Sequence, residues 1–178
     1  MKRAVVFICM GVGLAALCVP AALPVCVQNR VLVVYNPSDS VPRGWYRIGP
    51  AGSLHAGGIV LARLPAEAAA LAAQRGYLPV GIPLLKRIGA AAPQRVCVDG
   101  TSVRIDGVPV AVAKSADGRG RPLPAWQQCR PLSDGELFLL SNTNPASFDS
   151  RYFGPIAASA VIGSARPLWT WDATRGTP

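Results

Sequence analysis

The sequence predicts a mainly β domain with one or two short helices, preceded by one N-terminal transmembrane helix. Short segments rich in β-branched residues recur along the chain and alternate with turn residues, which is typical of a domain built from strands. Glycine and proline are abundant, with 18 and 17 copies, and this favours many turns over long helices. Residues 4–27 contain no charged side chain, as expected for a segment that crosses a membrane.

The uncharged run at 4–27 is long enough to span a bilayer, because about 20 helical residues cross its hydrocarbon layer. Two basic residues precede the run, and positively charged flanks tend to stay in the cytoplasm. We therefore expect a membrane anchor over residues 1–28 with a cytoplasmic N-terminus, and an exported domain over residues 29–178. A cleavable signal peptide is the alternative, since two prolines interrupt the end of the run.

The exported part is predicted to form short strands and at least one helix. Residues 66–75 lie between a proline and a glycine, which are typical flanks of a helix. Asp-Gly pairs at 99–100 and 106–107 divide residues 95–112 into three strands joined by tight turns. The polar, proline-rich residues 114–134 are expected to be a loop. Further strands are expected at residues 30–35, 58–64, 80–88, 136–141 and 158–169.

The net charge of +9 can indicate binding to nucleic acid or to an anionic membrane surface. The arginines are scattered along the chain, and no aromatic residues interleave with a basic stripe. We therefore expect no nucleic-acid partner, and a domain close to lipid headgroups explains the basic excess. A membrane-attached nucleic-acid binder remains an alternative, which the salt dependence of DNA affinity would test.

Cys97 and Cys129 are the two cysteines of the exported part. An oxidising compartment permits a disulfide between them, and an even pair of cysteines in an exported domain usually closes. We therefore expect a disulfide. Two buried free thiols are the alternative.

The residue inventory argues against several kinds of active site. His55 is the only histidine, and it lies in a segment expected to be an exposed turn, so a Ser-His-Asp triad has a single, poorly placed base. No His, Cys and carboxylate residues have the spacing of a zinc site, and no glycine-rich loop has the spacing of a nucleotide site. We expect neither a metal nor a cofactor.

The choice of lysine over arginine singles out one position. The exported part has 14 arginines but only two lysines, Lys86 and Lys114. Lys114 lies in a charged loop, where contact with solvent explains it. Leu84, Lys86 and Ile88 alternate onto one face of a predicted strand. Burial there would lower the lysine pKa, and a serine hydrolase without histidine needs such a neutral amine as its base. The alternative is a strand-edge lysine whose ammonium reaches water.

Four segments of the exported part resemble the sequence boxes of the signal peptidase I family. Residues 35–48, YNPSDSVPRGWYRI, resemble its nucleophile box, and residues 83–90, PLLKRIGA, resemble its lysine box. Residues 103–110 are similar to the hairpin that commonly follows, and residues 141–156, SNTNPASFDSRYFGPI, resemble the last box. The single-anchor form with SVPRGWY is most similar to the conjugative-transfer, TraF-type branch. The resemblance implies a signal peptidase-like, β-rich catalytic domain.

The resemblance implies catalytic roles for three residues. Ser40 matches the nucleophile, and Lys86 matches the general base that takes its proton. Asp149 matches one member of a pair that braces the site, and in the transfer-type branch it is closer to a third catalytic residue.

Three more residues match supporting positions. Ser38 matches a residue whose hydroxyl assists the oxyanion hole, Ser147 matches a serine that orients the lysine amine, and Arg151 matches the partner of Asp149. The chain departs from the family at Val41, where methionine is usual, and in the segment SNTNPAS, where Asn142 and Asn144 are left without a role.

The implied function is a serine endopeptidase that processes a membrane-tethered precursor polypeptide. By resemblance to the transfer branch, the precursor is a conjugative pilin subunit, and an amine in place of water would give a ligated or cyclised product. The implied location is the bacterial inner membrane, with one span and a periplasmic catalytic domain, in the context of a conjugation or secretion complex. A general signal peptidase for exported proteins and a non-catalytic scaffold of a secretion complex are the alternatives.

Overall fold

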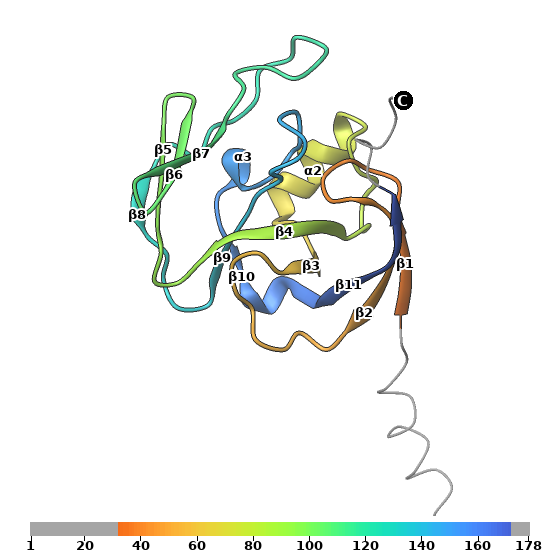
Figure 1. Cartoon of the computed structure of the whole chain (residues 1–178). Helices are drawn as coiled ribbons and strands as arrows, with labels where there is room; N and C mark the ends of the chain where they lie inside the picture. Colours follow the sequence, from red (N-terminus) through yellow and green to blue (C-terminus); the bar gives the residue numbers. More distant parts are fainter. Residues whose placement is uncertain (1–31, 172–178) are drawn as a thin grey trace, which may run out of the picture. The chain divides into compact units, whose positions relative to one another are not determined.

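The structure, a computed structural model of the chain, describes residues 32–171. The predicted membrane anchor at 1–28 lies outside this range. Within the range, no helix has both the length and the apolar character needed to span a membrane. The described chain is mainly β with few helices, which confirms that part of the prediction (Figure 1).

The larger sheet has seven strands in the order β1-β2-β11-β3-β4-β9-β10 (Figure 1). The neighbours β2-β11, β11-β3, β3-β4, β4-β9 and β9-β10 all pair antiparallel. β4 therefore has a strand on both sides, which buries its middle. The strands are β1 (Leu32–Asn36), β2 (Arg43–Gly49), β3 (Ile59–Ala62), β4 (Leu84–Ala91), β9 (Glu136–Leu139), β10 (Ile156–Ala157) and β11 (Val161–Trp171).

The smaller sheet has four strands in the order β7-β6-β5-β8. Its two Asp-Gly turns are the predicted ones, and Gly100 and Gly107 adopt the positive φ of 55° and 83° that tight hairpin turns require. These turns confirm the three strands expected between residues 95 and 112. The strands are β5 (Arg95–Asp99), β6 (Ser102–Ile105), β7 (Val108–Val112) and β8 (Cys129–Pro131).

Short helices fill the connections between strands. Helix α2 (Ala66–Gln74) begins after Pro65, and Gly76 follows its end with a φ of 72°, so the helix predicted at 66–75 is confirmed. The other helical segments are α3 (Ser150–Phe153) and the 3₁₀ helix η1 (Ala158–Ala160).

Several strand predictions need correction. β10 was not predicted, and the strand expected at 158–169 begins only at Val161, after η1. β2 was not predicted, although Gly44, Tyr46 and Ile48 are buried in alternation along it; its arginines and glycines masked the pattern. β8 was also not predicted, because a three-residue strand in a proline-rich segment depends on its partner β5 rather than on local composition. The strand expected from residue 80 begins only at Leu84, since Gly81 has a φ of 77° and starts a turn.

β4 and β9 link two apolar clusters. Phe138 and Leu139 are neighbours on β9 and both are fully buried, but they face opposite sides of the strand. Phe138 packs in the cluster that includes the inner side chains of the four-stranded sheet, whereas Leu139 packs in the cluster over β3 and β4. On β4, Ile88 and Ala90 likewise belong to different clusters, because a register shift in the pairing with β9 lies between them. The strand that carries Lys86 is thus fixed from both sides.

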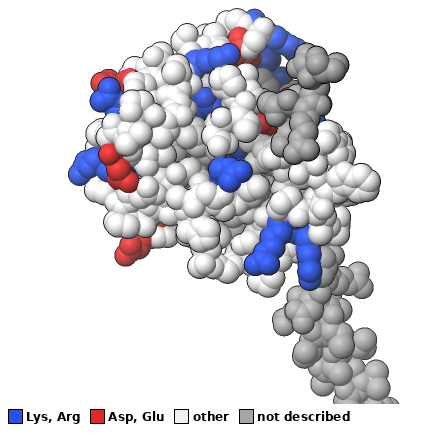
Figure 2. Space-filling view, viewed as in Figure 1, with Lys and Arg blue, Asp and Glu red and all other residues white. Residues whose placement is uncertain are grey.

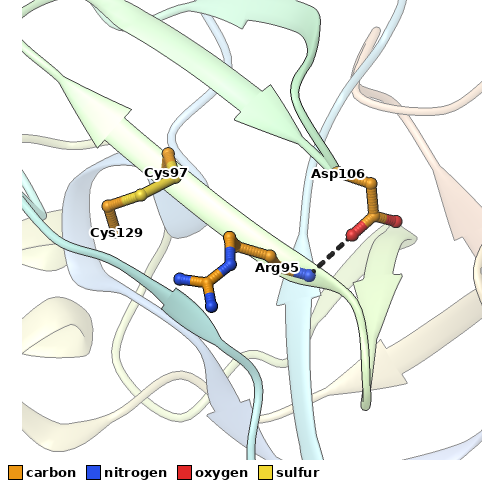
Figure 3. Close-up of a disulfide and its surroundings, with 4 residues drawn as sticks. All are labelled: Arg95, Cys97, Asp106 and Cys129. Atoms are coloured by element: carbon orange, nitrogen blue, oxygen red, sulfur yellow. Dashed lines mark hydrogen bonds between the residues drawn. A yellow bond between two sulfur atoms is a disulfide. The ribbon is translucent and has the colours of Figure 1, made fainter.

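A disulfide fastens the edge strand of the smaller sheet. Cys97 on β5 lies opposite Cys129 on β8, and the two side chains are bonded (Figure 3). Toward the start of β5, the backbone N–H of Arg95 donates to Asp106, with a distance of 2.8 Å (Figure 3). Because β8 ends the long connection from β7, the disulfide also fixes that connection at its far end.

Removal of the disulfide should destabilise the domain. The bonded cysteines are 32 residues apart, and opening a loop of this size should lower the free energy of unfolding by about 3 to 4 kcal/mol. Urea denaturation of the purified protein with and without a reductant measures the loss. The double variant Cys97→Ser, Cys129→Ser is the control and should match the reduced protein. Equal stability of the wild type in both conditions would contradict the prediction.

Candidate active site

Ser40 lies in the tight turn that joins β1 to β2, and Asn36 shapes that turn. The Asn36 side chain is 5% exposed and donates to the carbonyl oxygens of Ser38 and Val41, at 2.9 and 3.1 Å. These bonds replace the backbone bonds that the chain loses as it leaves the strand. Ser40 is therefore held at a fixed turn position rather than on a mobile loop.

Lys86 lies near the middle of β4, opposite Val60 on β3, and only 3% of it is exposed. Its Nζ lies 2.6 Å from the Oγ of Ser40 and also contacts the Oγ of Ser147. The two serine hydroxyls are 3.2 Å apart. The structure thus brings together one amine and two hydroxyls from three distant segments.

Burial lowers the pKa of Lys86 to about 8, because the ammonium loses its contact with water. The negative charge of Asp149 opposes this shift, and the positive charge of Arg151 adds to it. About one tenth of Lys86 is therefore neutral at pH 7, far more than for an ordinary lysine, and a neutral amine can accept a proton from a neighbouring hydroxyl.

Asp149 and Arg151 form a buried ion pair behind these three groups. Their exposed fractions are 0% and 1%, and the two distances between guanidinium and carboxylate are 2.7 and 2.9 Å. Arg151 also donates to the carbonyl oxygen of Ser147, at 2.9 Å. Among residues 32–171, no hydrogen bond joins Asp149 to Ser40 or Lys86. The pair therefore supports the position of Ser147 and acts on Lys86 through charge.

Ser38 is exposed beside Ser40 and hydrogen-bonds to Asn36. Its hydroxyl donates to the Asn36 side-chain oxygen at 2.8 Å, and its backbone N–H lies 3.2 Å from the same atom. A role for Ser38 as an oxyanion donor requires its hydroxyl to turn away from Asn36.

Three residues that hold the site together were not predicted from the sequence. Ser141 donates its hydroxyl to the Ser40 carbonyl oxygen, and Thr143 donates its hydroxyl to the Asp39 carbonyl oxygen, both at 2.9 Å. Asn36 is the third. The available signal was a run of small polar residues after the apolar strand β9. Such side chains can hydrogen-bond the unpaired backbone groups of a neighbouring turn.

A cleft of about 810 Å³ opens beside Ser40, Lys86 and Ser147. Its lining is mainly apolar, with leucine side chains from β3 and β4. Lys114, the other lysine of this part, is exposed in the connection after β7. Within residues 32–171, no three His, Cys, Asp or Glu side chains converge as they would around a metal ion. The arrangement is suited to nucleophilic attack on an extended, mostly apolar chain.

The lowered pKa of Lys86 can be measured by NMR of labelled lysine side chains, since the chain has only three lysines. One signal should titrate at about pH 8, and it should be absent from the Lys86→Met variant. Asp149→Asn should move this pKa further down, because the carboxylate charge that favours the ammonium is gone. If no lysine signal titrates below about pH 10, the usual range, Lys86 is not desolvated as described.

Comparison with known proteins assigns the family. The sequence model of the family described as signal peptidase, peptidase S26, matches residues 1–171. The plasmid transfer protein TraF of Escherichia coli is 37% identical over 109 residues, which cover 56% of this chain and 62% of that protein. The probable conjugal transfer protein TraF of Sinorhizobium fredii is 37% identical over 150 residues, which cover 76% of each chain.

The chain spans about three fifths of the length of its Escherichia coli relatives, 62% and 61%. Among solved structures, a signal peptidase I from Enterococcus faecalis is 20% identical with a TM-score of 0.39, covering 64% of this chain and 97% of that one. The resemblance noted in the sequence is confirmed by the family match and by the TraF relatives. The chain belongs to the signal peptidase family, peptidase S26, and is related to the TraF conjugal transfer proteins.

Proposed function

We propose that the chain is a membrane-anchored serine endopeptidase in which Ser40 is the nucleophile and Lys86 the general base. One observation carries the proposal: a lysine buried in the middle of a strand has its Nζ 2.6 Å from a serine hydroxyl that faces a cleft. A buried amine with a lowered pKa is a costly arrangement for stability alone, and such groups concentrate at functional sites.

The reaction follows from this contact. The Ser40 oxygen attacks the carbonyl carbon of the scissile peptide while its proton passes to the Lys86 amine. The tetrahedral intermediate then collapses, the C–N bond breaks, and the Lys86 proton passes to the departing amine. Water attacks the resulting ester with Lys86 again as base, which releases the new carboxyl end and restores Ser40. If an amine attacks instead, the product is ligated or cyclised.

Three groups support this chemistry. The backbone N–H of Ser40 and the hydroxyl of Ser38 would stabilise the oxyanion, and one such donor is typically worth about 3 kcal/mol. Ser147 keeps the Lys86 amine directed at Ser40. The Asp149–Arg151 pair holds Ser147 through its carbonyl oxygen. In this proposal Asp149 contributes by charge and by position rather than by proton transfer.

The substrate is proposed to be a precursor polypeptide that binds in extended form along the cleft, with a small residue such as alanine before the scissile bond. The relation to TraF conjugal transfer proteins supports a conjugative pilin precursor and a conjugation or secretion complex as the context. On the face shown in Figure 2, lysine and arginine side chains are dispersed among uncharged surface, without a continuous basic track. This supports a polypeptide substrate rather than a nucleic acid.

Exposed aromatic residues support a location beside a membrane, and the basic residues before the predicted anchor support the periplasmic side of the inner membrane. Tyr35, Trp45, Trp169 and Trp171 lie on the neighbouring strands β1, β2 and β11 and are 44 to 72% exposed. The Tyr35 ring lies 5.2 Å from Trp45 and 6.0 Å from Trp171. Tyrosine and tryptophan are enriched at the headgroup level of bilayers, and β1 follows the predicted anchor directly in the sequence.

Precursor processing tests the proposed dyad. Membranes carrying the wild type, Ser40→Ala or Lys86→Arg are given a pilin precursor and, in parallel, an ordinary exported precursor, and the products are read by mass spectrometry. Both variants should lose at least about 1,000-fold in rate, since one lacks the nucleophile and the other keeps its proton at working pH. Cleavage of both precursors by the wild type would favour a general signal peptidase.

The matched control is Ser133→Ala, at an exposed serine away from the cleft, which should process at the wild-type rate. The product mass distinguishes a cleaved chain from a cyclised one. Continued processing by Lys86→Arg would exclude a neutral amine as the base, and full function of Ser40→Ala in conjugation would favour the scaffold alternative.

The aromatic surface predicts contact with lipid. The chain has four tryptophans, so variants that keep one tryptophan and replace the others by phenylalanine can be placed in vesicles that contain brominated lipid. Fluorescence of Trp169, which is 72% exposed, should be strongly quenched. Trp126 is partly buried against Phe138 and is the control, with weaker quenching expected. Equal quenching of the two would contradict the proposed orientation.

A further inference from the structure

A second polar cluster joins two segments that line the cleft. One segment is the end of α2 and the residues after it, and the other is the connection between β7 and β8, the long teal loop in Figure 1. Tyr77 in the first segment donates its hydroxyl to Asp117 in the second. Arg121 and Arg75 lie against the same carboxylate, at 2.7 and 3.9 Å. We call these four residues the Asp117 clasp.

Asp117 is the centre of the clasp. Its side chain is 9% exposed, and its Oδ1 accepts the backbone N–H groups of Arg119 and Arg121, at 2.9 and 3.0 Å. The Tyr77 hydroxyl and these N–H groups hold its pKa well below the usual range, against the effect of burial. A carboxylate with this many donors is not an ordinary surface ion pair, and its loss would release the loop.

The two arginines tie the segments together in both directions. Arg75 at the end of α2 donates to the carbonyl oxygen of Pro122 at 2.7 Å, and Arg121 donates to the carbonyl oxygen of Arg75 at 3.3 Å. No strand pairing joins these segments within the described chain. The connection from β7 to β8 is therefore fixed to α2 by side chains.

The clasp also packs against a residue that lines the cleft. The Tyr77 ring lies against Phe148 with 5.4 Å between centroids. Tyr77, Asp117 and Phe148 all line the cleft. The clasp therefore forms part of the cleft wall.

We infer that the Asp117 clasp fixes the separation of the cleft walls. The clasp thereby determines how tightly the enzyme binds an apolar, extended precursor at the residues remote from the scissile bond. Asp117 is in this sense a positioning residue for substrate. The inference rests on the proposed function, because it requires that the cleft binds the precursor. Contacts remote from the reacting bond are the ones that can raise affinity without changing the chemistry there.

Peptide binding tests the clasp without turnover. The full chain with Ser40→Ala is titrated with two apolar peptides centred on an alanine site. One has about six residues on each side of the site and the other about two. Because an extended residue spans about 3.3 Å, only the long peptide reaches far from the site. The added variants Asp117→Asn and Tyr77→Phe should each weaken the long peptide about tenfold, or about 1.4 kcal/mol, and leave the short one unchanged. The double variant should bind the long peptide no more weakly than either single variant, because both substitutions remove the same Tyr77–Asp117 hydrogen bond.

Asp134→Asn, the same change at an exposed aspartate outside the cleft, is the control and should leave both affinities unchanged. If the clasp variants weaken both peptides equally, or neither, the inference is wrong. Turnover by chains that retain Ser40 is measured separately: for the long peptide the clasp variants should raise KM about tenfold at constant kcat. A wild type that binds the long peptide more tightly but cleaves neither would refute the proposed function while leaving the clasp assignment standing.

Discussion

The structure of this site depends on placing an amine inside an apolar strand. Lys86 is almost fully buried on β4, and an ammonium there loses most of its hydration, which favours the neutral form. Its two hydrogen-bonding neighbours in the described chain are hydroxyls, those of Ser40 and Ser147. A hydroxyl both donates and accepts, so these partners suit the ammonium and the neutral amine equally. Carboxylates in the same positions would stabilise only the ammonium.

The buried Asp149–Arg151 pair is compatible with this requirement because it is nearly balanced in charge. Asp149 raises the Lys86 pKa and Arg151 lowers it, so burial stays the largest influence. A buried ion pair costs desolvation energy that the Coulomb attraction alone rarely offsets. Here the guanidinium also donates to the carbonyl oxygens of Val112, Pro145 and Ser147, and the carboxylate accepts the Ser141 N–H. The pair therefore holds four backbone groups from two segments, the end of β7 and residues 141–147, and these bonds explain why the pair itself can be completely buried.

Much of this arrangement was predictable from the sequence, and the limits have physical causes. Asp-Gly pairs predicted the hairpins, because that signal is local. The alternation of Leu84, Lys86 and Ile88 indicated a buried lysine but left open one whose ammonium reaches water, and the structure has the buried one. The roles of Asn36, Ser141 and Thr143 were not predicted, because each acts on backbone atoms of a turn whose position only the fold determines. β8 was missed for the same reason. Similarity to the signal peptidase family singled out Ser40 and Ser147, and the structure places their hydroxyls 3.2 Å apart; their spacing in the sequence would not have predicted this contact.

The three polar groups of the candidate site come from segments that no local structure holds together. Lys86 is 46 residues from Ser40 and 61 from Ser147, and the bonds that fasten the Ser40 turn to the last segment join residues 101 and 104 positions apart. Each such contact forms only after the intervening chain has folded, because loop closure costs entropy that must be offset by the completed sheet. β4 is secured from both faces, and the Ser40 turn is held by side-chain hydrogen bonds and by Val41, which is 2% exposed in a third apolar cluster. Moving the proposed nucleophile away from the proposed base therefore requires the turn to lose both its hydrogen bonds and the burial of Val41, so the geometry of the site is tied to the core.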